Sequence, residues 1–425
     1  MNTKKAFLIF SIMLMSYSCS SKIDLQEISC MQIIDRNGLT ETINAKEKLE
    51  KYNNTNFDQP QAYQKVLRVY NKDSSGNTIS KLTCYHENGQ LWKSLEIVNA
   101  RAKGLYKEWH PNGNIKIQAY VIGGTPDFQY QNDWLFDGIN KAYDEEGKLA
   151  SEFNYHKGAL HGNTTHYFQN AQTKKIIPYS NNEINGEVIE YSSNRDIISK
   201  TTYKNGIKEG QSIGYWSQEN ISFIEDYENN LLINGQYFQK NRVKISKIKN
   251  GDGQQAIFTN NQLFRLIEYK NGSPDGKVQT FMPNGHLINE YYQKNNLKDG
   301  IETEYFSDNE IINFNKNKRL PKLEINWSNG NIHGMVKTWY KNNNQESQKE
   351  FSNNKKNGMN FAWYENSSLM FIEEYENDIL TKGSYFKINE KNPISTIIKG
   401  NGTATIFDSK GRFVKKTTYK EGSPL

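Results

Sequence analysis

Eleven glycines in this chain are each followed, five residues later, by an aromatic side chain, and the commonest step between successive glycines is 24 residues. The pairs are Gly104 and Trp109, Gly138 and Tyr143, Gly162 and Tyr167, Gly186 and Tyr191, Gly210 and Tyr215, Gly253 and Phe258, Gly276 and Phe281, Gly300 and Tyr305, Gly334 and Trp339, Gly358 and Trp363, and Gly402 and Phe407. A fixed period of this size indicates a repeat array, in which each unit packs mainly on its neighbours. The repeat therefore outweighs the chain length, which alone would suggest two or three domains.

Each repeat predicts two strands joined by a tight turn. Asn112-Gly113 and Asn284-Gly285 follow their leading glycine by eight and nine residues, and Asn-Gly is typical of a type I′ hairpin turn. A second ring often stands 17 residues after the glycine, as in Tyr155, Tyr179, Tyr203, Tyr227, Phe351, Tyr375 and Tyr419. A two-residue turn would place that ring opposite the glycine, whereas one more turn residue would reverse the facing of the second strand. The sequence leaves the face of each ring open.

Composition favours thin β layers held together by aromatic side chains. Hydrophobic residues make up 36% of the chain, yet it has 26 Tyr, 20 Phe and 7 Trp. Aromatic side chains bury a large area each, so they can hold such layers without a thick aliphatic core. We therefore expect an all-β chain of linked hairpins.

A larger period overlies the short one. The glycines from Gly138 to Gly253 correspond to those from Gly276 to Gly402, at offsets of 138 and then 148 to 149 residues. This predicts a tandem duplication of about 138–274 and 275–424, with an insertion of about ten residues around 316–326 in the second copy. Both copies break the 24-residue step near Gly235 and Gly383, which predicts a structural corner there.

The N-terminus resembles an export signal. Lys4 and Lys5 precede a short apolar run over residues 6–15, which is too short to span a membrane as a mature helix. Residues 1–18 are therefore predicted to be a signal peptide, and Cys19 to be the lipid-modified first residue of a bacterial lipoprotein. Ser16 departs from the usual lipoprotein pattern, and the alternative is an ordinary cleaved signal peptide with an incidental cysteine.

Residues 19–65 lack the repeat and are predicted to form a polar tether and an N-terminal cap, with a short helix over about 42–50. The repeat array is predicted over 66–424. In an exported protein Cys30 and Cys84 could form a disulfide, and the alternative is two free buried thiols.

The motifs Trp109-His110-Pro111-Asn112-Gly113 and Tyr155-His156-Lys157-Gly158 resemble the MORN-repeat variant family of bacteria, over about residues 66–424. The resemblance implies an elongated, twisted, single-layer antiparallel sheet of stacked β-hairpins. Such proteins are often described as YwqK-type antitoxins, although an antitoxin meets its toxin in the cytoplasm and this chain opens with an export signal. Related eukaryotic repeats are associated with membrane surfaces and protein scaffolds.

Candidate chemistry is sparse. His156, His161 and His166 are spaced five apart, but no cysteine or paired carboxylate of ligand spacing accompanies them, so we expect no metal and no cofactor. No nucleophile elbow or phosphate-binding loop is found, which argues against an enzyme. The net charge of +6 is scattered, without the basic clusters typical of nucleic-acid binding.

We therefore expect a non-enzymatic protein, anchored to the membrane through its lipid, that presents a surface to a protein partner at the bacterial cell envelope. The alternatives are a module that binds glycans or lipid headgroups, and an antitoxin. The long step that contains Gly123-Gly124-Thr125-Pro126 and the insertion around Leu320-Pro321 are the expected recognition loops.

Overall fold

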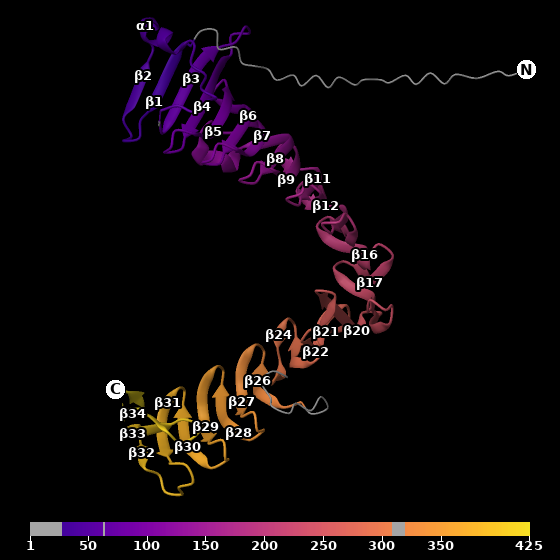
Figure 1. The fold of residues 1–425 in the computed structure, drawn as a ribbon, viewed down its shortest axis with the longest axis vertical. Coiled ribbons are helices and arrows are strands. Elements are labelled where there is room, and N and C mark those ends of the chain that lie inside the picture. Colours follow the sequence, from indigo (N-terminus) through magenta and orange to yellow (C-terminus); the bar gives the residue numbers. More distant parts are fainter. Residues whose placement is uncertain (1–27, 63, 308–318) are drawn as a thin grey trace, which may run out of the picture. The chain divides into compact units, whose positions relative to one another are not determined.

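The computed structural model describes residues 28–62, 64–307 and 319–425. Nearly all of the regular structure in these residues is antiparallel strand, arranged as successive hairpins in an open single layer (Figure 1), which confirms the expected all-β hairpin fold. The chain divides into two compact units, Met1–Leu160 and His161–Leu425.

In the first unit the strands follow chain order from β3 onward, and β1 pairs with both β2 and β3. Its elements are β1 (Cys30–Ile34), β2 (Thr40–Ile43), α1 (Lys46–Leu49), η1 (Glu50–Tyr52), β3 (Val66–Lys72), β4 (Thr78–Tyr85), β5 (Leu91–Val98), β6 (Arg101–Trp109), β7 (Ile115–Gly123), η2 (Phe128–Asp133), β8 (Leu135–Tyr143), β9 (Leu149–His156) and β10 (Ala159–Leu160).

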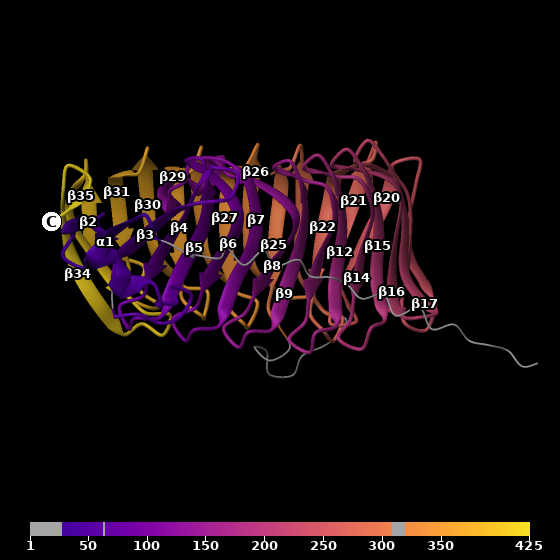
Figure 2. The same ribbon diagram turned by 90° about the horizontal axis from the view of Figure 1, so that it is seen from above.

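In the second unit each strand likewise pairs with its neighbours in the chain, as the ribbon seen from above also shows (Figure 2). Its strands are β11 (Gly162–Tyr167), β12 (Thr173–Ser180), β13 (Glu183–Ile184), β14 (Gly186–Tyr191), β15 (Ile197–Lys204), β16 (Ile207–Ser217), β17 (Asn220–Glu228), β18 (Leu231–Phe238), β19 (Lys244–Lys249), β20 (Asp252–Thr259), β21 (Gln262–Lys270), β22 (Ser273–Phe281), β23 (Leu287–Lys294), β24 (Leu297–Lys298), β25 (Gly300–Tyr305), β26 (Pro321–Ser328), β27 (Asn331–Trp339), β28 (Gln345–Ser352), β29 (Lys355–Trp363), β30 (Leu369–Glu376), β31 (Ile379–Tyr385), β32 (Ser395–Ile398), β33 (Asn401–Phe407), β34 (Phe413–Lys420) and β35 (Ser423–Pro424).

Most loops within a hairpin hold three residues. The His110 N–H donates to the Asn114 carbonyl oxygen at 2.8 Å, and the three residues between them form the loop. The type I′ turn predicted at Asn112-Gly113 is wrong, because only Gly113 has a positive φ, at +90°. A single left-handed residue at the end of a three-residue loop is instead typical of a type I turn with a bulge.

The type I′ turns lie in the connectors between hairpins. Asn205 and Gly206, for example, have φ values of +49° and +80° and join β15 to β16. Both central residues of this turn need positive φ, which asparagine and glycine tolerate best. The connectors are therefore tight hairpin turns in their own right, and the two edges of the sheet are built differently.

The predicted pairing of the leading glycine with the ring 17 residues later is confirmed. Gly138 lies opposite Tyr155, and the same register holds for Gly162, Gly186, Gly210, Gly334, Gly358 and Gly402. The loop has one residue more than the prediction assumed, but a bulge between Ala142 and Tyr143 shifts the register by one and offsets it.

The two sets of rings lie on opposite faces of the sheet. Side chains alternate along a strand, so residues two and four after the leading glycine share one face, here called the glycine face. Residues one, three and five after it share the other face, here called the ring face. The residue two after the glycine is buried in Tyr106, Asn140, Thr164, Val188, Ser212, Val278, Glu302, Asn360 and Ala404.

The N-terminal segment differs from the expected tether. Strands β1 and β2 extend the sheet beside β3, and Leu49 of α1 packs with Met31, Ile43 and Leu67 in a buried cluster. A capping segment of this kind covers the outermost repeat. Met31 and Ile43 are separated by polar residues, so their shared burial was not evident from composition.

The segment between β7 and β8 covers the opposite face. Trp134 is 5% exposed and packs with Tyr106 and Phe128, at ring-centroid distances of 5.1 and 6.4 Å. The segment after Gly123-Gly124, expected to be a free recognition loop, thus folds back onto the sheet. Its aromatic residues are what hold it there.

Candidate binding surface on the repeat sheet

The leading glycines serve a bend in the backbone. All eleven have positive φ, from +69° at Gly138 to +145° at Gly402, a region that costs other residues energy. A side chain at Gly358 would also meet Glu350 Oε2 at 2.0 Å. The predicted close approach of the opposite ring is not what excludes a side chain there, because the nearest atoms belong to the preceding hairpin.

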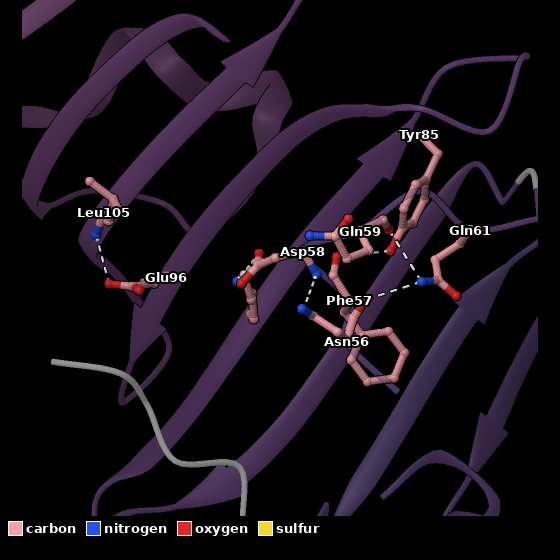
Figure 3. A network of polar contacts seen from close by, with 9 residues as sticks. Asn56, Phe57, Asp58, Gln59, Gln61, Tyr85, Glu96 and Leu105 are labelled. Carbon is pink, nitrogen blue, oxygen red and sulfur yellow. Dashed lines mark hydrogen bonds and ion pairs between the residues drawn. The ribbon is translucent and has the colours of Figure 1, made fainter. Parts of the chain in front are cut away.

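Carboxylates of the preceding hairpin bind the backbone beside three of these glycines. Glu96 accepts a hydrogen bond from the Leu105 N–H at 2.8 Å (Figure 3), and Glu268 accepts one from Lys277 N–H at 2.8 Å. Glu350 does the same for Met359 at 3.2 Å. The glycine thus leaves room for a carboxylate that ties one hairpin to the next.

The cap uses a similar polar network. Figure 3 shows the Tyr85 hydroxyl reaching the Phe57 carbonyl oxygen at 3.3 Å, and Gln61 Nε2 donating to the Asn56 carbonyl oxygen at 3.1 Å. These contacts fix residues 56–61 against β4. They stabilise the edge of the array and present no free binding group.

The residue after the ring forms a second ladder along the loop edge. Nε2 of His110 lies 3.2 Å from the Tyr143 carbonyl oxygen, and His86 makes the same contact with the Trp109 carbonyl oxygen at 3.1 Å. The Tyr340 hydroxyl donates to the Trp363 carbonyl oxygen at 2.7 Å. The contact joins successive hairpins.

Buried carboxylates on the glycine face are held by neighbouring side chains. Glu302 is 6% exposed and accepts hydrogen bonds from Lys298, Trp327 and Asn289 at 2.6, 2.8 and 3.0 Å. Lys298 also lies over the Trp327 ring at 4.9 Å. Each donor reduces the free-energy cost of burying the charge.

The two corners repeat one arrangement. Tyr237 and Tyr385 are fully buried, and each donates a 2.8 Å hydrogen bond to a buried glutamate, Glu225 and Glu373 respectively. Gln255 adds a 2.8 Å bond to Glu225. Burial and the nearby carboxylate raise the pKa of both tyrosines, so the hydroxyls stay protonated donors.

The ring face of the second copy carries an apolar strip, defined here as Ile301, Tyr305, Met335, Trp339, Met359 and Trp363. Ile301 and Met359 are 47% and 37% exposed, and the other four are half-buried. The strip runs over β25, β27 and β29, three successive hairpins. Phe361 stacks on Trp363 with centroids 5.8 Å apart and planes at 15°. The result is a ridged surface of aliphatic and aromatic side chains.

Charged groups border the strip. Lys337 and Glu324 form an ion pair at 3.4 Å. Glu290 accepts a hydrogen bond from the Tyr305 hydroxyl at 2.9 Å. Burial opposes ionisation of Glu290, but hydrogen bonds from Tyr305 and Gln279 outweigh it and lower its pKa. Burial, together with the bond to Glu290, raises the pKa of Tyr305 to about 12.

The cysteines are free in the structure. Cys84 is buried and Cys30 half-buried, and the expected disulfide between them is not formed. Cys30 lies opposite Tyr70, which lies opposite Ser80, so four residues of β4 separate this level from Cys84. This is roughly 13 Å along the strand, well beyond the Cα separation of about 7 Å that a disulfide allows. Cys19 and residues 1–18 lie outside the described residues.

The histidines sit on separate strands. His156 ends β9 and lies 3.8 Å from Asp137, His161 is exposed in the connector, and His166 is on β11. Burial and nearby lysines lower the pKa of His166. In the part of the chain that the structure describes, no group of three or more His, Cys, Asp or Glu side chains is placed to hold a metal.

Sequence reasoning missed the apolar strip. Its signal was present, because the residue after the leading glycine is Ile301, Met335 and Met359 in three successive repeats. Only the register shows that this position shares a face with the ring four residues later. None of the described helices is long and apolar enough to cross a membrane.

Two segments, residues 103–122 and 136–157, match the family model described as MORN repeat variant. They correspond to the hairpins β6–β7 and β8–β9, so the chain contains repeats of this type. No curated protein matches the chain.

Solved structures that resemble it include the Photorhabdus luminescens Tc holotoxin pore, at 11% identity and a TM-score of 0.14, over 93% of this chain and 26% of that one. Another is a crystal structure of TcdB2-TccC3, at 10% identity and a TM-score of 0.14, over 93% of this chain and 24% of that one. The chain spans about a quarter of those proteins, and a likeness this weak carries no argument about function.

Proposed function

We propose that this is an exported, lipid-anchored, non-enzymatic repeat protein that presents its apolar strip to another protein at the bacterial cell envelope. The observation that carries the proposal is the strip itself, six aromatic and aliphatic side chains in register on three hairpins. Aromatic residues and methionine are enriched in protein interfaces. The export signal and Cys19 support the location.

The strip favours a protein over a glycan as partner. A sugar-binding surface needs flat rings accompanied by polar groups that hydrogen-bond to hydroxyls. Here Ile301 and Met359 are the most exposed members of the strip, and both are aliphatic. Exposed aliphatic side chains gain from burial against another apolar surface. A glycan or lipid headgroup remains the second outcome of the test.

The first copy supplies the test variant. Its residues at the three positions are Asn163, Glu187 and Gln211. We would replace Ile301→Asn, Met335→Glu and Met359→Gln together, since the same scaffold already carries these residues. A photoreactive amino acid at Lys337, between the strands, would crosslink the bound partner in cells, and the partner would then be identified and produced.

The expected result is one discrete protein, bound at least tenfold more weakly by the triple variant. The control replaces Asn163→Ser, Glu187→Gln and Gln211→Ser and should leave the Kd unchanged. Binding of purified glycan or anionic vesicles alone would overturn the protein partner. Absence of palmitate label that depends on Cys19, with a soluble cytoplasmic product, would overturn the envelope location and favour an antitoxin.

A further inference from the structure

A cavity of about 620 Å³ opens in the first unit, between the strands at its N-terminal edge and the segment that follows β7. Arg68, Cys84 and Lys93 line its floor on β3, β4 and β5. Phe128 and Asp127 line its wall. The cavity begins where the cover provided by η2 ends, so the sheet face is open to a small molecule there.

The cavity is cationic. Lys65, Arg68 and Lys93 contribute three positive charges and Asp127 one negative charge, a formal total of +2. Burial raises the pKa of the Cys84 thiol to about 12, so it remains neutral. None of the three cations forms an ion pair with a carboxylate of the residues that the structure describes. Uncompensated positive charge in a partly enclosed site attracts an anion.

The donors are held in place. Arg68 Nη2 donates to the Pro126 carbonyl oxygen at 3.2 Å, which fixes the guanidinium, while its buried Nε has no partner. Lys93 Nζ lies 5.0 Å from the Trp92 ring centroid and 5.8 Å from that of Phe128. Trp92 is 42% exposed and lines the same cavity. A buried donor without a partner costs free energy that a bound acceptor would recover.

We infer that this cavity binds a small molecule with an oxyanion group, a carboxylate or a phosphate, carried on a planar or apolar body. The oxyanion is bound by Arg68 and Lys93, since an arginine fork suits the two oxygens of such a group. The body packs against Trp92 and Phe128. This site is separate from the apolar strip and does not depend on the proposed function.

The test is calorimetric titration of the full chain with benzoate and with phenyl phosphate, and with benzyl alcohol as the uncharged analogue. We expect one saturable site with a Kd on the order of 1 mM for at least one anion. The stronger of the two anions identifies the group. Binding should weaken as salt is added.

Arg68→Gln and Lys93→Gln should each weaken binding roughly tenfold, the effect of losing one charged hydrogen bond. Lys103→Gln, an exposed lysine on β6 outside the cavity, is the matched control and should change the Kd less than twofold. Circular dichroism checks the fold of each variant. If Arg68→Gln unfolds, Lys93→Gln decides.

The inference is overturned if neither anion binds saturably, if benzyl alcohol binds as tightly, or if Lys103→Gln weakens binding as much as Lys93→Gln.

Discussion

The hairpins of the two copies share a register and differ in what they expose. In β11, β14 and β16 the residue after the leading glycine is Asn163, Glu187 or Gln211, and all three are exposed. In β25, β27 and β29 the corresponding residues are aliphatic. The glycine, the bulge and the buried residue two positions later recur in both copies. The scaffold is therefore set by a few positions, and the ring face is free to vary.

The comparison is most severely tested at the leading glycines. Gly358→Ala should destabilise the second copy by about 2–4 kcal/mol, because it places a side chain at a φ of +116° and displaces Glu350 from the Met359 N–H. Gly210→Ala should cost only about 1–2 kcal/mol, since its nearest neighbour, Thr202, would be 3.7 Å away. Urea unfolding with hydrogen exchange of each hairpin would measure both losses. Equal losses would mean that the Glu350 contact contributes nothing.

The corner glutamates give the next largest difference. Glu225 would keep Tyr227 and Gln255 as donors after Tyr237→Phe, so we expect a loss of about 1 kcal/mol. The position that corresponds to Gln255 in the second copy is Ala404, which cannot donate. Tyr385→Phe should therefore cost about 2–3 kcal/mol. Chemical denaturation of the two variants would check the order, and a larger loss for Tyr237→Phe would contradict it.

Acid should weaken the second copy around Glu290. Because hydrogen bonds lower its folded-state pKa below the ordinary 4.5, the ionised carboxylate stabilises the fold above that pH. This contribution should be lost as the pH falls from about 4.5 through the lowered folded value. Hydrogen exchange of β22–β25 between pH 6 and 3 would follow it. Glu290→Gln should remove this part of the pH dependence, and an unchanged profile would argue against the assignment.

The smallest expected effect on stability is that of the apolar strip. The triple variant Ile301→Asn, Met335→Glu and Met359→Gln should alter unfolding by no more than about 0.5 kcal/mol per site, as surface substitutions usually do. Thermal unfolding would measure this. A large loss would show that the strip is part of the core.

The reciprocal exchange sharpens the comparison. Asn163→Ile, Glu187→Met and Gln211→Met would build a second strip on the first copy. If the ring face alone determines recognition, the exchanged chain should bind a second equivalent of the partner. Sedimentation of the complex would give the stoichiometry, and an unchanged ratio would show that flanking residues such as Trp339 are also required.

Much of the fold could be predicted from the sequence, because each glycine and ring has a local role. The pairing of Gly138 with Tyr155 follows from their spacing in the chain. The turn type does not, since Asn112-Gly113 fits both a type I′ turn and the end of a bulged three-residue loop. The bulge depends on backbone hydrogen bonds that leave no trace in the sequence.

The candidate sites were harder to predict. The burial of Trp134 against Tyr106 depends on a chain reversal that brings residues far apart in the repeat together. The cavity beside it combines Arg68 with Phe128, 60 residues later, and no spacing rule relates the two. The exposed Ile301 and Met359 were visible as residues, but their common face became clear only from the register.

The bulge that offsets the three-residue loop also limits how such a chain can change in length. Deleting one loop residue without removing the bulge would turn every following side chain over, so that Tyr155 would exchange sides with Asn154. Length can therefore change safely only in paired steps or by whole hairpins. The 24-residue spacing is thus preserved by the geometry of the sheet, while the residues within each loop remain free to diverge.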